Sequence, residues 1–204
     1  MGALDQPAPL FDPELESEHV VVYTPSNNPG RVVLSGMVLR NKNNESAIIG
    51  NDENGNPIIL LPGERAVVST VASPRGFNFK LNKCSGYLAQ SVTYNPGIST
   101  YCPSVSELES ARNLSEKCEL FLRRINSCTT PLLNYESGID NQCAAFIGEH
   151  ASYTGCVRDF KNDQDFNQKE WRIYLGRQRE FWSNLREDIY LYSQSGILIT
   201  KTSY

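Results

Sequence analysis

The stretch NKCSGYLAQSVTYNPGISTYCP, Asn82–Pro103, separates two parts of the chain that differ in sequence pattern. Short β-branched runs precede it, and a cysteine-rich segment with helical spacing follows it. The stretch contains Cys84-Ser85-Gly86, a small group of the kind that can carry a nucleophile on a tight turn, and it ends next to Cys102. Cys84 has three possible roles: a reactive thiol, a metal ligand or half of a disulfide. Its role decides whether the chain is better interpreted as an enzyme or as a crosslinked domain.

The residues before this stretch predict short strands. HVVVYTP (19–25) and GRVVLSGMVLRNK (30–42) are rich in β-branched residues, and FNFKLN (77–82) alternates apolar and polar side chains. Asn54-Gly55 and Pro62-Gly63 punctuate the apolar runs between them. Because Asn-Gly between apolar runs is a strong hairpin signal, we expect a hairpin there.

The segment after the stretch predicts helices. SVSELESARNLSEKCELFLRRINSC has helical spacing, and Ser115 is placed to cap the helix. NQCAAFIGEHASYTGCVRDFKND predicts a second helical segment, broken near Gly148 or Gly155. The apolar face of the first helix contains Leu114, Cys118, Phe121, Leu122 and Ile125.

Strand patterns return after residue 165. EWRIYL (170–175) predicts a strand, GRQREFWSNLRE (176–187) an amphipathic helix presenting Phe181, Trp182 and Leu185, and DIYLYSQSGILITKTSY (188–204) a hairpin with its turn near Ser193–Gly196. The order strands, helices, strands predicts a mainly β fold. We expect a β-sandwich formed by residues 18–104 and 166–204, with a helical insertion at 105–165. Residues 1–17, with three prolines and only acidic charges, predict an extended linker.

The six cysteines favour disulfides over metal binding. They are Cys84, Cys102, Cys118, Cys128, Cys143 and Cys156. A cysteine zinc site needs close pairs such as CxxC, and even Cys118 and Cys128, the closest two, are far wider apart. The only histidines, His19 and His150, are distant in sequence. We therefore predict three disulfides, no metal site and an oxidising compartment.

The pairing follows from how the helical segments pack. An antiparallel helical hairpin would form Cys128–Cys143 near its turn and Cys118–Cys156 at its open end. The alternative is sequential pairing, Cys118–Cys128 and Cys143–Cys156. A regular helix from 118 to 128 would span ~15 Å, whereas a disulfide joins Cα atoms ~5.5 Å apart. We favour the nested pairing, which leaves Cys84–Cys102 as the third disulfide.

Composition excludes some classes of function. A net charge of −4 is the opposite of the basic bias of nucleic-acid binders, so a nucleic-acid partner is not expected. No apolar run approaches the ~20 residues that span a bilayer. The N-terminus shows no signal-peptide pattern, and we expect that an export signal or upstream region preceded it.

No catalytic constellation emerges from the sequence. A Cys-His enzyme needs a histidine beside its thiol, and no G-x-S-x-G nucleophile elbow is present. Asp159, Asp163 and Asp165 cluster in DFKNDQDFN, but the glycine and terminal glutamate of an EF-hand are missing. This cluster is typical of a solvated loop. We predict no catalytic residues and no cofactor.

The best binding candidate is the region from 158 to 186, where aromatic residues alternate with arginines. Such a pattern can stack on sugars or bases. The candidate ligand-binding residues are Trp171, Arg172, Tyr174, Arg177 and Trp182. The alternative is that Trp171 and Trp182 fill the core, with the arginines at its rim.

Three motifs in order resemble the lamin tail domain family. VVLSGMVLRNKNN resembles its strand-Leu-Ser-Gly motif, IILLPGERAVVS its PGE segment, and DIYLYSQSGILITKTSY its closing hairpin. The resemblance covers residues 30–82 and 188–204. Met37 stands where tryptophan is common in the family, and Thr200-Lys201 where it usually has an aspartate.

The cysteine-rich middle resembles a subgroup of exported proteins from small-genome bacteria. The family resemblance implies an immunoglobulin-like sandwich and brings no catalytic residues. We expect a non-enzymatic exported module for binding, adhesion or envelope interaction, with a protein or glycan partner, located outside the cell, at its surface or in the periplasm. The alternatives are an accessory or degenerate hydrolase domain acting on polysaccharide or nucleic acid, and a purely structural envelope protein.

Overall fold

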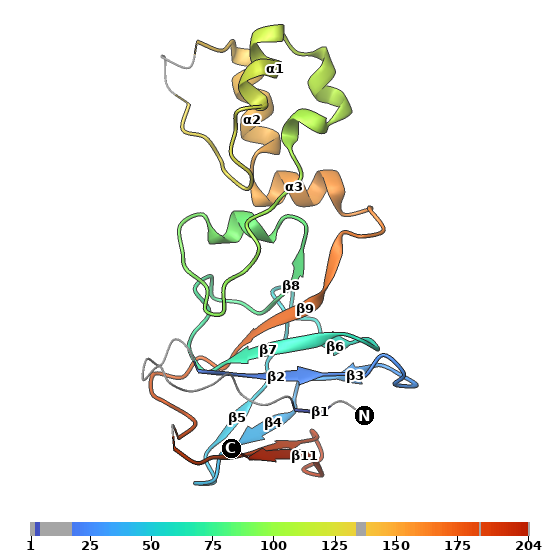
Figure 1. The fold of residues 1–204 in the computed structure, drawn as a ribbon, viewed down its shortest axis with the longest axis vertical. Helices are drawn as coiled ribbons and strands as arrows, with labels where there is room; N and C mark the ends of the chain where they lie inside the picture. The colour runs from blue at the N-terminus through green and yellow to red at the C-terminus, as the bar shows by residue number, and fades with distance from the viewer. Residues whose placement is uncertain (1–2, 5–17, 134–137, 184, 204) are drawn as a thin grey trace. The chain divides into compact units, whose positions relative to one another are not determined.

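Strands in three sheets dominate the regular structure, as expected for a mainly β chain (Figure 1). The computed structural model describes residues 3–4, 18–133, 138–183 and 185–203. The chain divides into unit 1, Met1–Lys80 with Lys169–Tyr204, and unit 2, Leu81–Gln168. Unit 2 therefore includes the stretch from 82 to 103 as well as the helical segments. The predicted linker, 1–17, lies outside the described residues apart from Ala3–Leu4.

The largest sheet has five strands in the order β1-β2-β7-β9-β8. These are β1 (Ala3–Leu4), β2 (His19–Tyr23), β7 (Arg65–Ser69), β9 (Asn167–Tyr174) and β8 (Phe79–Asn82). β2 is antiparallel to β7, and β7 is parallel to β9. The chain passes from unit 1 to unit 2 within β8, after Lys80, and returns within β9, at Lys169.

The second sheet has the order β11-β10-β4-β5, all antiparallel. Its strands are β4 (Val38–Arg40), β5 (Ser46–Ile48), β10 (Asp188–Tyr192) and β11 (Leu198–Ser203). β10 and β11 form the predicted closing hairpin, and β10 pairs with the early strand β4. A small third sheet pairs β3 (Val32–Val33) with β6 (Ile59–Leu60).

Side chains from the two larger sheets meet in one core within unit 1. Alternate residues point into this core, so Ile189 and Leu191 of β10 are buried while Tyr190 between them is half-buried. Each buried aliphatic side chain of this size stabilises the fold by about 1.5–3 kcal/mol. The core residues of the strands are Val20, Val22, Leu39, Ala47, Leu60, Ala66, Val68, Ile173, Ile189 and Leu191.

The predicted turn at Asn54-Gly55 is present, although the strands around it pair elsewhere. The backbone N–H of Gly55 donates to the Asp52 carbonyl over 3.1 Å, and Gly55 has φ +80°. The flanking strands β5 and β6 belong to different sheets, so the predicted hairpin is wrong. Gly36 also has φ +80° and divides the predicted strand 30–42 into β3 and β4.

The predicted helix at 176–187 is also wrong, since none of its described residues is helical. Phe181 and Trp182 are buried in the unit 1 core, whereas Leu185 is 90% exposed. Phe181 and Trp182 enter the core from an irregular loop and not from a helix face. Polar contacts from three other segments hold this loop in place, as described below.

The described part of unit 2 forms three short α-helices, α1 (Glu116–Leu122), α2 (Asn141–His150) and α3 (Tyr153–Phe160). Each has an N-cap side chain that accepts a backbone N–H, and the first is the predicted Ser115. The other caps are Asp140 and Ser152. Ser115 Oγ also donates to Asp140 Oδ2 over 2.9 Å, which ties the start of α1 to the start of α2.

The second helical segment breaks between the two glycines and not at either of them. Ala151 has φ −85° and ψ +57°, which ends α2, and Ser152 begins α3. Gly148 lies inside α2 and Gly155 inside α3. A Cβ at Gly155 would lie 2.2 Å from the Glu149 carbonyl oxygen, so this position requires glycine for close packing.

All six cysteines form disulfides, but the connectivity differs from the favoured one. The pairs are Cys84–Cys156, Cys102–Cys128 and Cys118–Cys143, in place of 84–102, 128–143 and 118–156. The sequential alternative is not found either.

Helix length explains the correction. α1 ends at Leu122, and Cys128 follows in a turn with φ +56°. It can therefore reach Cys102 instead of lying on a helix beside Cys143. The break at Ala151 places Cys143 and Cys156 on different helices. Cys143 then faces α1, and Cys156 faces Cys84.

Candidate binding surface

The five candidate ligand-binding residues do not share one exposed surface. Trp182 and Arg172 are buried, with 2% and 5% exposure. Arg172 Nη2 lies 2.7 Å from Glu170 Oε1. Trp171 packs partly against the unit 1 core, with the Lys80 ammonium 5.7 Å from its ring centroid. Tyr174, at the end of β9, is half-buried, and its backbone N–H donates to Asn78 Oδ1 over 2.8 Å.

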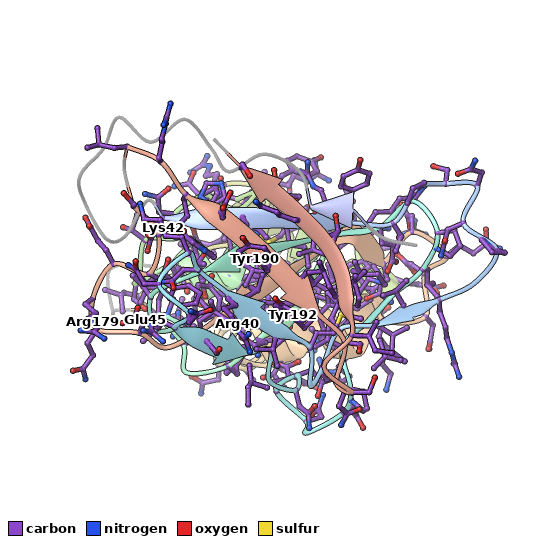
Figure 2. All side chains as sticks on the ribbon, turned by 90° about the horizontal axis from the view of Figure 1, so that it is seen from below. Arg40, Lys42, Glu45, Arg179, Tyr190 and Tyr192 are labelled. Carbon is purple, nitrogen blue, oxygen red and sulfur yellow. A yellow bond between two sulfur atoms is a disulfide. The ribbon has the colours of Figure 1, made fainter. Side chains whose placement is uncertain are left out.

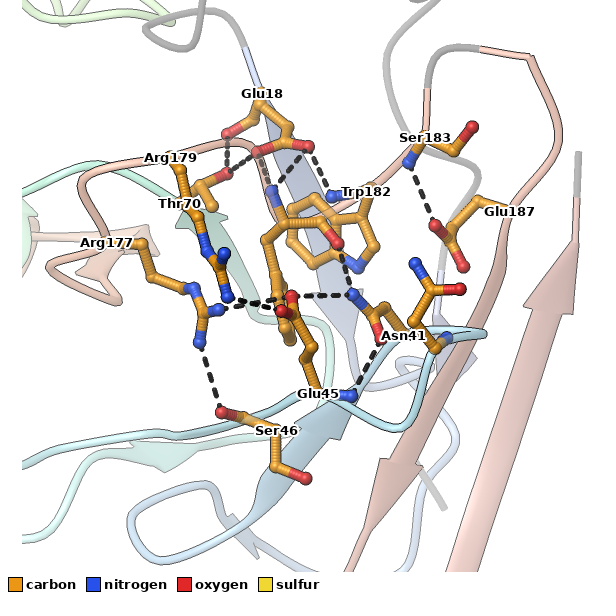
Figure 3. Close-up of polar contacts among 12 residues, drawn as sticks. Glu18, Asn41, Glu45, Ser46, Thr70, Arg177, Arg179, Trp182, Ser183 and Glu187 are labelled. Atoms are coloured by element: carbon orange, nitrogen blue, oxygen red, sulfur yellow. Dashed lines mark hydrogen bonds and ion pairs between the residues drawn. The ribbon is translucent and has the colours of Figure 1, made fainter.

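Arg177, the fifth candidate, braces the loop after β9. Its guanidinium lies 4.5 Å from the Phe181 ring centroid and 3.3 Å from Glu45 Oε2. It also donates to the Ser46 carbonyl over 3.3 Å, which covers part of the edge of β5. Arg179 reaches the same carboxylate, with Nη2 2.5 Å from Glu45 Oε1 (Figure 3). These arginines stabilise the fold at its rim.

A buried carboxylate anchors the same loop (Figure 3). Glu18 is 2% exposed and accepts hydrogen bonds from the backbone N–H groups of Phe181 and Trp182 and from the Thr70 hydroxyl, at 2.6–3.2 Å. Asn41 Nδ2 donates to the Phe181 carbonyl over 2.7 Å. Burial raises the pKa of the Glu18 carboxyl, although its three donors pull that pKa downward. Its role is structural.

The outer face of the β11-β10-β4-β5 sheet aligns aromatic, cationic and apolar side chains. Cross-strand register places Leu198, Tyr192, Val38 and Ile48 in one row across all four strands. The next row contains Lys201, Tyr190, Arg40 and Ser46. We call this surface the tyrosine face, and define it as Val38, Arg40, Ile48, Tyr190, Tyr192, Leu198 and Lys201.

Aromatic rings and cations stack on the tyrosine face. The centroids of Tyr190 and Tyr192 are 6.3 Å apart, with 28° between the ring planes. The Arg40 guanidinium lies 4.7 Å from the Tyr192 centroid, and the Lys201 ammonium 5.1 Å from that of Tyr190. Each such contact contributes about 0.5–1 kcal/mol at an exposed site. Figure 2 looks onto this face and shows Tyr190 and Tyr192 beside Arg40.

Apolar side chains complete the face. Ile48 is 68% exposed and Leu198 is 49% exposed. A β-bulge in β11 shifts the register between Leu191 and Tyr192. Because Ile199 is the extra residue and packs against the core, Leu198 remains outward in the same row as Tyr192.

The sequence contained a signal for this face that the prediction did not use. DIYLY alternates, and its Ile and Leu occupy the buried positions of β10. In a strand, successive side chains point to opposite faces, so Tyr190 and Tyr192 had to share the outer one. The pairing with Arg40 depends on the register of β10 against β4, which a single sequence does not reveal.

The groups considered for catalysis are engaged elsewhere. Cys84 is in a disulfide with Cys156. His150 Nδ1 lies 2.6 Å from Asp159 Oδ2 in unit 2. Asp163 and Asp165 both contact the Lys83 ammonium, at 2.9 and 2.5 Å, and the hydrogen bonds that Lys83 donates to Asp165 and Asp163 raise its pKa. Across the described residues, no cluster of His, Cys, Asp and Glu has the arrangement of a metal site.

Three disulfides indicate an oxidising, non-cytoplasmic environment. Within the ranges that the structure describes, no helix has the length and apolar character needed to cross a membrane. No protein-family model, curated protein or solved structure matches the chain.

Proposed function

We propose that the chain is an exported, non-enzymatic binding module that docks a protein partner on the tyrosine face. The observation that best supports this proposal is the preformed stack of Tyr190 and Tyr192 with Arg40 and Lys201, next to the exposed Ile48. The lamin-tail resemblance supports the same role, because that family's sandwich acts as a binding module. On the basis of that resemblance, we also propose that the sandwich has an immunoglobulin-like topology and that the chain belongs to the bacterial subgroup named above.

The composition of the face favours a protein over a glycan. Tyrosine and arginine are enriched at protein interfaces and among their hot spots. A sugar stacks on an open ring face, but each ring here has a cation and the other tyrosine beside it. The exposed Ile48 and Leu198 need an apolar partner surface, which a protein provides. Holding Arg40 on a ring in advance also lowers the entropy lost on binding.

The test compares face variants with matched controls. Intact biotinylated protein is applied to arrays of cell-surface and exported proteins and to glycan arrays. Ile48→Lys and Tyr192→Ser alter the face, whereas Leu185→Lys alters a side chain that is 90% exposed outside it. We expect a protein partner whose Kd rises at least about 30-fold in the face variants, as for hot-spot residues, and is unchanged in the control.

Two results would contradict the proposal. One is a protein partner whose affinity is the same for Ile48→Lys and Leu185→Lys. The other is that the face variants lose binding to a glycan while no protein binding depends on the face. That result would assign the face to polysaccharide recognition.

A further inference from the structure

Unit 2 contains a cleft beside the Cys102–Cys128 disulfide, with a volume of about 160 Å³. Pro103, Val105 and Ile125 supply apolar wall, and Ser104 lines it as well. Two tyrosines, Tyr87 and Tyr101, also line it, together with Glu107 and Asn126. We call it the Tyr101 cleft. None of its residues belongs to the tyrosine face of unit 1.

Tyr87 contributes a mostly buried tyrosine side chain to the cleft. The residue is 6% exposed and forms part of the cleft wall. Burial raises the pKa of Tyr87, so the hydroxyl stays protonated and remains a donor at neutral pH. A tyrosine hydroxyl at the wall of a cavity can donate a hydrogen bond to a ligand oxygen.

Tyr101 is the opposite case, an aromatic ring left open to solvent. It is 82% exposed, and no described residue forms a ring-stacking or cation–π contact with it. Its backbone is fixed, because its N–H donates to Ser99 Oγ over 3.3 Å and the next residue is in a disulfide. A flat exposed ring held in place offers a stacking surface for a ring with an apolar face.

The polar side chains of the cleft suit a neutral, hydroxylated ligand. Glu107 and Asn126 are exposed and provide planar acceptors and an amide donor. No lysine or arginine lines the cleft, so nothing there compensates a phosphate or sulfate. Sugar rings combine an apolar C–H face with hydroxyls at the edge, which matches an open tyrosine ring beside these groups.

The cleft is built on rigid backbone. Ser127 Oγ accepts the Cys102 N–H over 2.7 Å and donates to the Cys102 carbonyl over 3.2 Å, next to the disulfide. The disulfide also packs against Gly86, where a Cβ would lie 2.2 Å from Cys128 Sγ. Walls fixed in advance reduce the entropic cost of binding.

We propose that the Tyr101 cleft binds one neutral sugar residue, stacked on Tyr101 and hydrogen-bonded by Tyr87, Glu107 and Asn126. This site is separate from the proposed protein-docking face, so either can fail without the other. It would give the module a second, carbohydrate ligand.

The experiment uses the intact oxidised chain. Neutral oligosaccharides of glucose, galactose, mannose and N-acetylglucosamine are screened on an array, and hits are titrated by calorimetry beside sulfated oligosaccharides and a lysine-rich peptide. Tyr101→Ala and Tyr87→Phe test the cleft. Tyr23→Phe makes the same hydroxyl deletion on a 37% exposed tyrosine of unit 1, outside the tyrosine face, and is the matched control. Non-reducing mass mapping confirms the three disulfides in each variant.

We expect a neutral oligosaccharide whose affinity falls at least tenfold in Tyr101→Ala and several-fold in Tyr87→Phe, with no change in Tyr23→Phe. The proposal is overturned if no neutral oligosaccharide binds at millimolar concentration. It is equally overturned if the cleft variants leave sugar binding intact, or if the cleft selects the sulfated or lysine-rich probes.

Discussion

Gly155 and Gly148 lie in neighbouring short helices, but only one of them needs to be glycine. A Cβ at Gly155 would meet the backbone carbonyl oxygens of Glu149 and His150, at 2.2 and 2.8 Å. A Cβ at Gly148 would meet nothing within 4 Å. From the sequence alone, each of these two glycines predicts a helix break. The difference depends on how the end of α2 approaches α3, and only the structure contains that contact.

We expect alanine to have opposite effects at these two positions. Gly148→Ala should stabilise unit 2 by about 0.5–1 kcal/mol, because alanine favours an exposed helix. Gly155→Ala should destabilise it by about 1–3 kcal/mol or more, since backbone atoms block the new methyl group. Urea unfolding followed by circular dichroism at 222 nm measures both. Equal effects of the two substitutions would show that α2 and α3 do not approach as described.

Elements were predictable where one residue pattern dominates. The strands at 19–25 and 170–175 and the hairpin at 188–203 follow from β-branched or alternating runs. The loop at 176–187 was mistaken for a helix because its aromatic residues suggest an amphipathic face. What decides its conformation is Glu18, whose bonds to the loop come from a segment far away in sequence. Long-range contacts of this kind leave no local pattern.

The Glu18 anchor makes the stability of unit 1 depend on pH. Its folded-state pKa is raised above the ordinary value near 4.5 by burial, so the folded state binds the proton more tightly than the unfolded state. This contribution is complete below the unfolded pKa and is lost as pH rises through the folded pKa. The unfolding free energy should therefore fall across that window, and the fall should disappear in Glu18→Gln.

Tryptophan fluorescence measures this, because Trp171 and Trp182 both belong to unit 1. The comparison is urea unfolding of the wild type and Glu18→Gln between pH 4 and pH 7. A wild-type unfolding free energy that instead rises through this window would mean that hydrogen bonding to the carboxylate outweighs its burial.

At the scale of the whole chain, the disulfides and the tryptophans lie in different units. All six cysteines lie in unit 2, and both tryptophans lie in unit 1. The presence of three disulfides could be predicted from cysteine number and spacing, but their connectivity could not. Connectivity depends on where α1 ends and where the chain turns at Ala151, which are details of one or two residues.

Reduction should therefore affect the two units unequally. Each disulfide closes a loop, with sequence separations of 25, 26 and 72 residues, and contributes about 3.5–4.5 kcal/mol in a chain-entropy model. We expect dithiothreitol to remove hydrogen-exchange protection from 84–160 while the tryptophan-detected midpoint of unit 1 shifts little. A matching loss of protection in β2, β7 and β10 would show instead that the two units unfold as one.

The strands that lead into and out of unit 2 are neighbours in the sheet. β8 lies beside β9, and just past its end the Lys83 N–H donates to the Phe166 carbonyl over 2.9 Å. Because the two ends of this segment are so close, one tight turn could replace the whole segment and still connect β8 to β9. Evolution could therefore insert or replace this segment, with its disulfides and its cleft, without changing the sheet that carries it.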